Sequence, residues 1–168
     1  RYQINFLQKK NLKKKTLSME NMKIKMIKMS INYKILLNYI KDLSVENTNA
    51  ESFIIARENI SKYSLDIDIS SKAIKNKMIE IYTKLIFHDK RNTKKKSHFE
   101  MVYATVVQIN DEKPNKDELK KLLLCDIQIE IFPKLENAFV EVLKHSGFEN
   151  LRLKGKIDFD KLYKQKLS

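Results

Sequence analysis

The fold is decided by residues 63–109, which contain YSLDIDIS at 63–70, MIEIYTKLIF at 78–87 and FEMVYATVVQI at 99–109. In the first segment, apolar residues alternate with Asp66 and Asp68, a period of two that is typical of a half-buried strand. The second and third segments are rich in β-branched and aromatic residues, which favour strands. A polar loop, HDKRNTKKKS at 88–97, separates them as in a hairpin. The stretch therefore predicts consecutive antiparallel strands.

Beyond this stretch the apolar spacing changes from a period of two to the period of about 3.6 residues that marks a helix. Phe132-Pro133 is predicted to open this helix, because proline suits the first helical turn. Gly147 is predicted to cap its end. The apolar residues in between share one face: Leu135, Ala138, Phe139, Val142 and Leu143. Strands followed by an amphipathic helix predict an α+β fold in which the helix covers the sheet.

Residues 126–131 (DIQIEI) fit two structures. They alternate as a strand does, yet Ile131 also continues the helical spacing that runs into Leu135. Periodicity alone does not decide between a strand and a helix here.

The flanking segments are less regular. At least the end of residues 31–46 is predicted to be a strand, because Leu43 and Val45 alternate with polar residues. Residues 53–63 lack a clear period and are expected to form a crossing connection. A bulge or short turn is expected from Ser70 to Asn76. Residues 117–124 are predicted to form a short helix, and Asp158 to cap a last one.

The positive charge is concentrated at the start of the chain. The formal net charge is +13, and residues 1–41 carry eleven Lys or Arg and one acid. Residues 1–30 are expected to be a basic, flexible extension ahead of a single domain at 31–168. An alternative function follows from the same charge: a nucleic-acid-binding module that uses the N-terminal lysines Lys13–Lys15 and the 90–97 loop with Lys94–Lys96.

The chain lacks the residues that several classes of function require. The chain has two glycines, too few for a phosphate-binding loop. Its only cysteine, Cys125, has no evident base partner, and the three histidines show no metal-ligand spacing. We therefore expect no cofactor, no metal and no catalysis. No apolar run approaches the length of a membrane span, so we expect no direct membrane insertion, and a cytoplasmic location fits the cysteine content.

An ordered series of short motifs across residues 31–166 resembles one known family, the bacterial export chaperone SecB. The family's first strand is similar to YIKDLSVE at 39–46, followed by Asn49-Ala50, and its second strand to LDID at 65–68. IFP at 131–133 resembles the family's lead into its long helix. GF at 147–148, LRL at 151–153 and IDFDKLY at 157–163 resemble its ending.

The resemblance implies a four-stranded antiparallel sheet with a long helix and a shorter C-terminal helix, assembled as a dimer of dimers. It also implies that residues 117–131 are helical or loop-like, not a fifth strand. The implied activity is ATP-independent holding of unfolded preproteins and their delivery to the translocation motor SecA. No nucleic-acid partner is expected on this interpretation.

The resemblance also assigns residues to surfaces. The SecA-contact candidates are Asp42, Glu46, His98 and Glu100. The candidates for subunit association are Phe99, Met101 and Tyr103, which share one face of their strand by period two. Four further apolar residues are client-groove candidates, with the protein core or a subunit interface as the alternatives: Val106, Ile109, Phe132 and Phe139.

Overall fold

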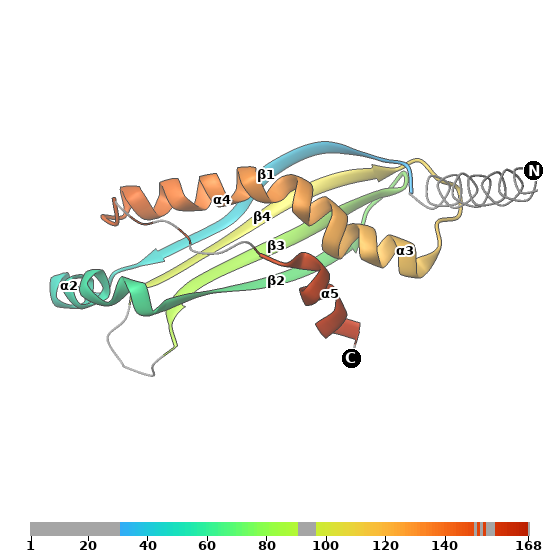
Figure 1. The fold of residues 1–168 in the computed structure, drawn as a ribbon. Helices are drawn as coiled ribbons and strands as arrows, with labels where there is room; N and C mark the ends of the chain where they lie inside the picture. Colours follow the sequence, from blue (N-terminus) through green and yellow to red (C-terminus); the bar gives the residue numbers. More distant parts are fainter. Residues whose placement is uncertain (1–30, 91–96, 150, 152, 154–156, 168) are drawn as a thin grey trace, which may run out of the picture.

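One four-stranded antiparallel sheet forms the base of the fold (Figure 1). The structure is a computed structural model that describes residues 31–90, 97–149, 151, 153 and 157–167. The strand order is β1-β4-β3-β2, so the first strand pairs with the last. The strands are β1 (Tyr33–Glu46), β2 (Tyr63–Ala73), β3 (Met78–Asp89) and β4 (His98–Ile109). The predicted α+β class is confirmed.

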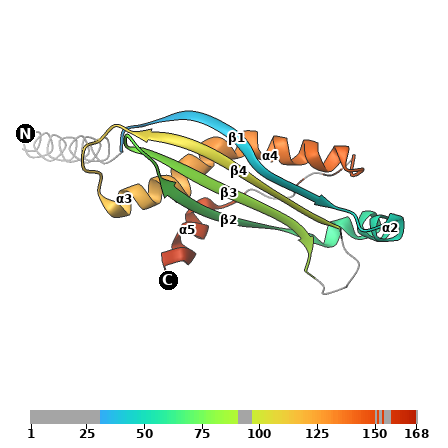
Figure 2. The same cartoon turned by 180° about the vertical axis from the view of Figure 1, so that it is seen from behind.

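The helices that follow β4 lie over one face of this sheet, and its other face is open among the described residues (Figure 2). A continuous helical run joins three of them and ends at His145. The helices are α2 (Ala50–Asn59), the 3-10 turn η1 (Ile60–Lys62), α3 (Lys116–Lys121), the π-helix η2 (Leu122–Asp126), α4 (Ile127–His145) and α5 (Phe159–Leu167).

The strands follow the predicted alternation, with two differences in extent. β2 runs without a break to Ala73, and the turn lies at 74–77, where Asn76 and Lys77 take positive φ angles of 60° and 58°. The break expected from Ser70 was therefore placed too early. β1 includes nearly all of residues 31–46, with irregularities in its pairing to β4 at Leu36 and Lys41.

The segment between β1 and β2 is the expected crossing connection, because these strands form opposite edges of the sheet, and most of it is helical. The side chain of Asn49 caps α2 by accepting a hydrogen bond from the Ser52 amide at 2.8 Å. Only Ser52 and Ala56 are buried in this helix, whereas Ile54 and Ile55 are exposed. The helix therefore has no apolar face, and periodicity gave no signal for it.

Residues 127–131 belong to α4, as the family resemblance implied. Ile127 and Ile131 are buried on the helical face that continues to Leu135, whereas Ile129 is 54% exposed. A strand would have placed all three isoleucines on one side. Pro133 lies inside α4 and does not open it, so that prediction was wrong. The helical run begins upstream at α3, whose cap is Asn115, with its side chain 2.8 Å from the Asp117 amide.

The two predicted caps, Gly147 after α4 and Asp158 before α5, are confirmed. Gly147 has a φ of 99°, and the Phe148 amide donates to the Leu143 carbonyl at 3.1 Å, which closes α4 in a Schellman motif. A side chain on Gly147 would meet the Phe53 ring at 2.5 Å, so glycine is required there for space as well. Asp158 caps α5 by accepting from the Lys161 amide at 2.9 Å.

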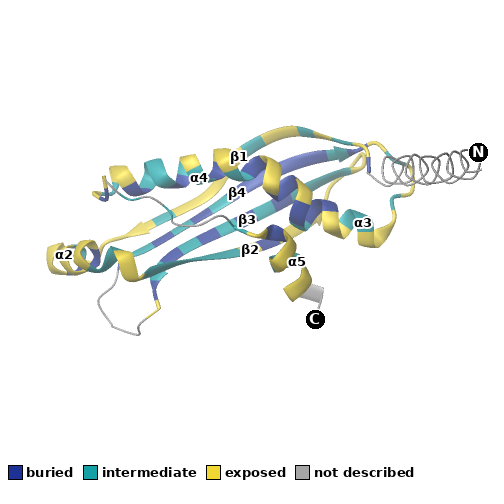
Figure 3. Ribbon diagram, in the orientation of Figure 1, coloured by how far each residue is buried: buried dark blue, intermediate teal, exposed yellow. Residues whose placement is uncertain are grey.

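Buried residues of the sheet and of α4 face each other (Figure 3), and they form two apolar clusters. One contains Ile81, Ile127 and Ile131, and the other Met101, Leu135 and Phe139. A buried polar pair also joins the sheet to the helix: the Thr83 hydroxyl on β3 donates to Gln128 Oε1 at 2.8 Å. Gln128 Nε2 then donates to the Leu123 carbonyl in the π-helix at 3.1 Å.

Candidate binding surfaces

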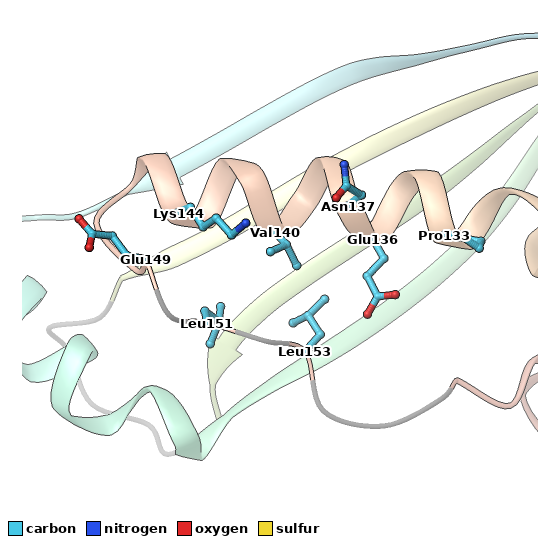
Figure 4. Close-up of a pocket in the computed structure, with 8 residues that line it drawn as sticks. All are labelled: Pro133, Glu136, Asn137, Val140, Lys144, Glu149, Leu151 and Leu153. Carbon is cyan, nitrogen blue, oxygen red and sulfur yellow. The ribbon is translucent and has the colours of Figure 1, made fainter.

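A hollow lies beside α4, against the segment that follows this helix (Figure 4). Its volume is about 710 Å³. We call it the α4 groove, and the residues that line it are Pro133, Glu136, Asn137, Val140, Lys144, Glu149, Leu151 and Leu153.

The α4 groove has apolar walls with charged ends. Val140 on the helix and Leu151 and Leu153 on the returning segment supply its aliphatic side chains, all of them half-buried (Figure 4). Lys144 is already paired with Glu141 at 2.6 Å, and this contact lowers the pKa of the Glu141 carboxyl. Such a groove can accept an aliphatic segment through burial of apolar surface, with its charged rim left in water.

The open face of the sheet carries the four predicted SecA-contact residues. The pairing register places Asp42 opposite Val102, and Glu46 opposite His98. Glu100 lies between them on β4, opposite Ser44. The structure therefore brings all four residues together on one face, across two neighbouring strands. Their part in binding SecA stays a prediction.

The acids on this face differ in their surroundings. Glu100 is 2.6 Å from the Lys84 ammonium and 3.6 Å from His98, and the hydrogen bond from Lys84 is the main cause of its lowered pKa. Asp42 and Glu46 are exposed, and no described cation lies within ion-pair distance of either. The face is thus a mixture of compensated and uncompensated carboxylates.

The predicted subunit-association residues lie on the opposite face of β4, under α4. Phe99 and Met101 have no exposed surface, and Tyr103 is 8% exposed. They belong to the same cluster as Leu135 and Phe139. Within the described protomer they are core residues, and any effect on assembly stays a prediction.

Three of the predicted client-groove residues belong to or pack against the two clusters, Val106 belongs to neither, and none of the four lines the α4 groove. Ile109 and Phe139 are buried in the core, and Val106 is 8% exposed on the other side of β4. Phe132 is half-buried and meets the Phe159 ring of α5 edge-on, with centroids 5.5 Å apart. A client can therefore reach Phe139 only if α4 moves, and the proposed role of these residues is untested.

A second apolar surface runs along β1, which pairs only with β4 within the protomer. Ile40, Leu43 and Val45 lie opposite Tyr103, Met101 and Phe99, on the core-facing side of the sheet. They are 43%, 44% and 38% exposed, because no described helix covers this edge. Large exposed apolar residues in a row mark an interaction surface.

Metal binding and thiol chemistry have no support among the described residues. Within 31–90, 97–149, 151, 153 and 157–167 there is no cluster of three or more potential metal ligands. Cys125 is buried and donates to Asp160 Oδ1 at 3.3 Å, and burial raises the pKa of its thiol to about 11. A thiol with so high a pKa is a poor nucleophile at neutral pH. No helix in this part of the chain is long and apolar enough to cross a membrane.

Of the lysines in the nucleic-acid alternative, Lys13–Lys15 and Lys94–Lys96 lie outside the described residues, and Lys90 is paired with Asp66 at 2.9 Å. The expected domain boundary at residue 30 also falls at the edge of the undescribed segment.

Comparison with known proteins gives one consistent result. The family model described as preprotein translocase subunit SecB matches residues 26–168. The protein assigned as protein-export protein SecB in Pelagibacter ubique (strain HTCC1062) is 44% identical over 138 residues, which cover 82% of this chain and 99% of that protein. The SecB of Rickettsia bellii (strain OSU 85-389) is 30% identical over 131 residues, covering 77% of this chain and 84% of that one.

The fold has a solved counterpart. The SecB-like chaperone of Mycobacterium tuberculosis, solved in complex with a peptide from an antitoxin, superimposes with a TM-score of 0.57 at 10% sequence identity. The match covers 74% of this chain and 90% of that one.

These matches place the chain in the class of protein-export chaperones. Within that class it belongs to the SecB family.

Proposed function

We propose that this protein binds unfolded preproteins without ATP in the cytoplasm, holds them competent for translocation and delivers them to SecA, as a homotetramer. The observation that carries the holding activity is the α4 groove, whose aliphatic walls Val140, Leu151 and Leu153 are half-buried and open to a ligand. Membership of the SecB family supports the same function.

The physical basis of holding is burial of apolar surface. Each Å² of apolar area removed from water contributes about 25 cal/mol, and this attraction needs no nucleotide. Unfolded chains expose such area and native proteins hide it, so the groove discriminates by folding state and not by sequence. Clients that fold slowly stay bound longest, which suits proteins that must reach a membrane unfolded.

The substitution Val140→Glu tests the groove. A carboxylate on its wall must lose water when an apolar client segment binds, so we expect client affinity to fall about tenfold or more. The measurement is the delay in refolding of a slow-folding precursor at increasing chaperone concentration. Ile129→Glu is the matched control, because Ile129 lies on the same helix, is 54% exposed and does not line the groove. Equal effects of both variants would show that the α4 groove is not the client site.

The exposed apolar edge of β1 supports the proposed assembly. Burying Ile40, Leu43 and Val45 against a second copy removes them from water and covers the free edge of the sheet. We expect Leu43→Lys to lower the solution mass measured by light scattering from that of a tetramer, with an unchanged circular dichroism spectrum. Ile74→Lys makes the same change at a residue 41% exposed in the β2–β3 turn, and it should leave the mass unchanged. A wild-type protein with the mass of a monomer would contradict the assembly.

A further inference from the structure

Lys84 forms the shortest ion pair that the described residues make on the open sheet face, and its partner is one of the predicted SecA-contact acids. Its ammonium lies 2.6 Å from Glu100 Oε1. Lys84 is opposite Val102 on β4, and Glu100 is opposite Ile86 on β3, so the pair is a diagonal one across neighbouring strands. The side chains are 37% and 21% exposed, respectively. Glu100 is therefore partly withdrawn from solvent and already has a cation.

The second oxygen of Glu100 is also engaged. His98 Nε2 lies 3.6 Å from Glu100 Oε2. A cationic group from a partner therefore approaches a carboxylate that has the Lys84 ammonium on one oxygen and the His98 ring beside the other. The lowered pKa of the Glu100 carboxyl agrees with this geometry, because the Lys84 hydrogen bond stabilises its ionised form.

The remaining predicted contact acids, Asp42 and Glu46, have no such cation among residues 31–90, 97–149, 151, 153 and 157–167. Asp42 Oδ1 accepts from the backbone amide of Leu43 at 3.0 Å, and Glu46 Oε1 is 3.4 Å from the Ser44 hydroxyl. Both hydrogen bonds leave the negative charge uncompensated. An approaching Lys or Arg gains the full attraction of Asp42 and Glu46 without displacing a protein group.

We infer that Lys84 is an internal counter-ion that competes with SecA for Glu100, so that Asp42 and Glu46 carry the contact and Lys84 weakens it. The inference rests on the proposed delivery to SecA. It concerns the strength of that contact, which Lys84 lowers because SecA must break an existing ion pair to reach Glu100. When SecA binds this face, a cation of SecA replaces Lys84 at Glu100, so little attraction is gained there. At Asp42 and Glu46 no described cation is replaced, so the new ion pairs add to the binding free energy.

The test is the affinity of the full-length protein for SecA from the same organism, measured by calorimetry at low salt. Lys84→Met removes the counter-ion and keeps much of the aliphatic stem. Exposed ion pairs are weak, so we expect binding to strengthen about twofold to fivefold. Lys72→Met is the control, since Lys72 is a β2 residue opposite Glu80 on the same face and has no ion pair with Glu100 among the described residues. It removes an equal charge and should change affinity less than Lys84→Met.

A double-mutant cycle makes the mechanism specific. In a Glu100→Gln background the gain from Lys84→Met should disappear, because no carboxylate is left to release. Asp42→Asn should weaken SecA binding more than Glu100→Gln does. Raising the salt concentration to about 1 M should abolish the gain, since the Debye length is then about 3 Å. Circular dichroism melting confirms that each variant is folded.

The possible outcomes separate the two proposals. If the wild type binds SecA and Lys84→Met gains no more affinity than Lys72→Met, the counter-ion role is refuted and delivery to SecA stands. The same conclusion follows if the gain from Lys84→Met persists in the Glu100→Gln background. If neither wild type nor Lys84→Met binds SecA, delivery itself is refuted, and the counter-ion role with it. Binding by Lys84→Met alone supports both proposals and shows that the counter-ion blocks the contact in the wild type.

Discussion

Phe139→Ala is expected to lower the free energy of unfolding by about 3–5 kcal/mol, the largest effect of any single substitution proposed for this chain. Phe139 has no exposed surface and belongs to the cluster that joins α4 to β3 and β4, with Met101 and Leu135. Removing its ring leaves a cavity that the helix cannot close, because α4 is also held through Thr83 and Gln128.

Equilibrium denaturation in urea measures this loss. Ile129→Ala on the exposed side of α4 is the control and should change stability by no more than about 0.5 kcal/mol. The two substitutions remove apolar groups from one helix and differ chiefly in burial. A small effect of Phe139→Ala would mean that α4 does not pack on the sheet as described.

Gln128→Leu is expected to destabilise the protein by about 1–3 kcal/mol, although leucine is more apolar than glutamine. The reason is that the buried Thr83 hydroxyl loses its acceptor and the Leu123 carbonyl loses the Gln128 side-chain donor at the same time. Gln128 is 1% exposed and Thr83 has no exposed surface, so water does not replace the lost bonds.

The second half of this test is the double variant. Adding Thr83→Val removes the orphaned hydroxyl and keeps the shape of the side chain, so Gln128→Leu with Thr83→Val should recover part of the lost stability. The measurement is again urea denaturation of the single and double variants. Strictly additive losses would show that the two side chains are not coupled in solution.

Period two in β2 to β4 and period 3.6 in α4 made most of the fold predictable, because each element buries one face continuously. α2 was missed for the opposite reason: it buries only Ser52 and Ala56. The ambiguity at residues 126–131 was resolved by Ile129, which is exposed on α4 while Ile127 and Ile131 are buried. No local pattern contains that information.

The candidate surfaces were predictable in part. Motif likeness nominated Asp42, Glu46 and Glu100, and the register of β1 against β4 brings them together. The Lys84 contact was missed, because pairing across β3 and β4 depends on a register that sequence alone does not provide. The residues of the α4 groove were also missed. In the sequence Val140 is an ordinary helix residue. It lines a groove only because the segment with Leu151 and Leu153 folds back beside α4.

The strand order has a consequence for the synthesis of this protein. β1 pairs with β4, whose residues follow roughly 50–75 positions later in the chain, so β1 has no partner while β2 and β3 are being made. Ribosomes add about 5–20 residues per second, and the unpaired strand is therefore exposed for seconds. Its Ile40, Leu43 and Val45 make it an edge prone to aggregation during that time. The nascent chain is therefore expected to need a cover for β1 until β4 has been made.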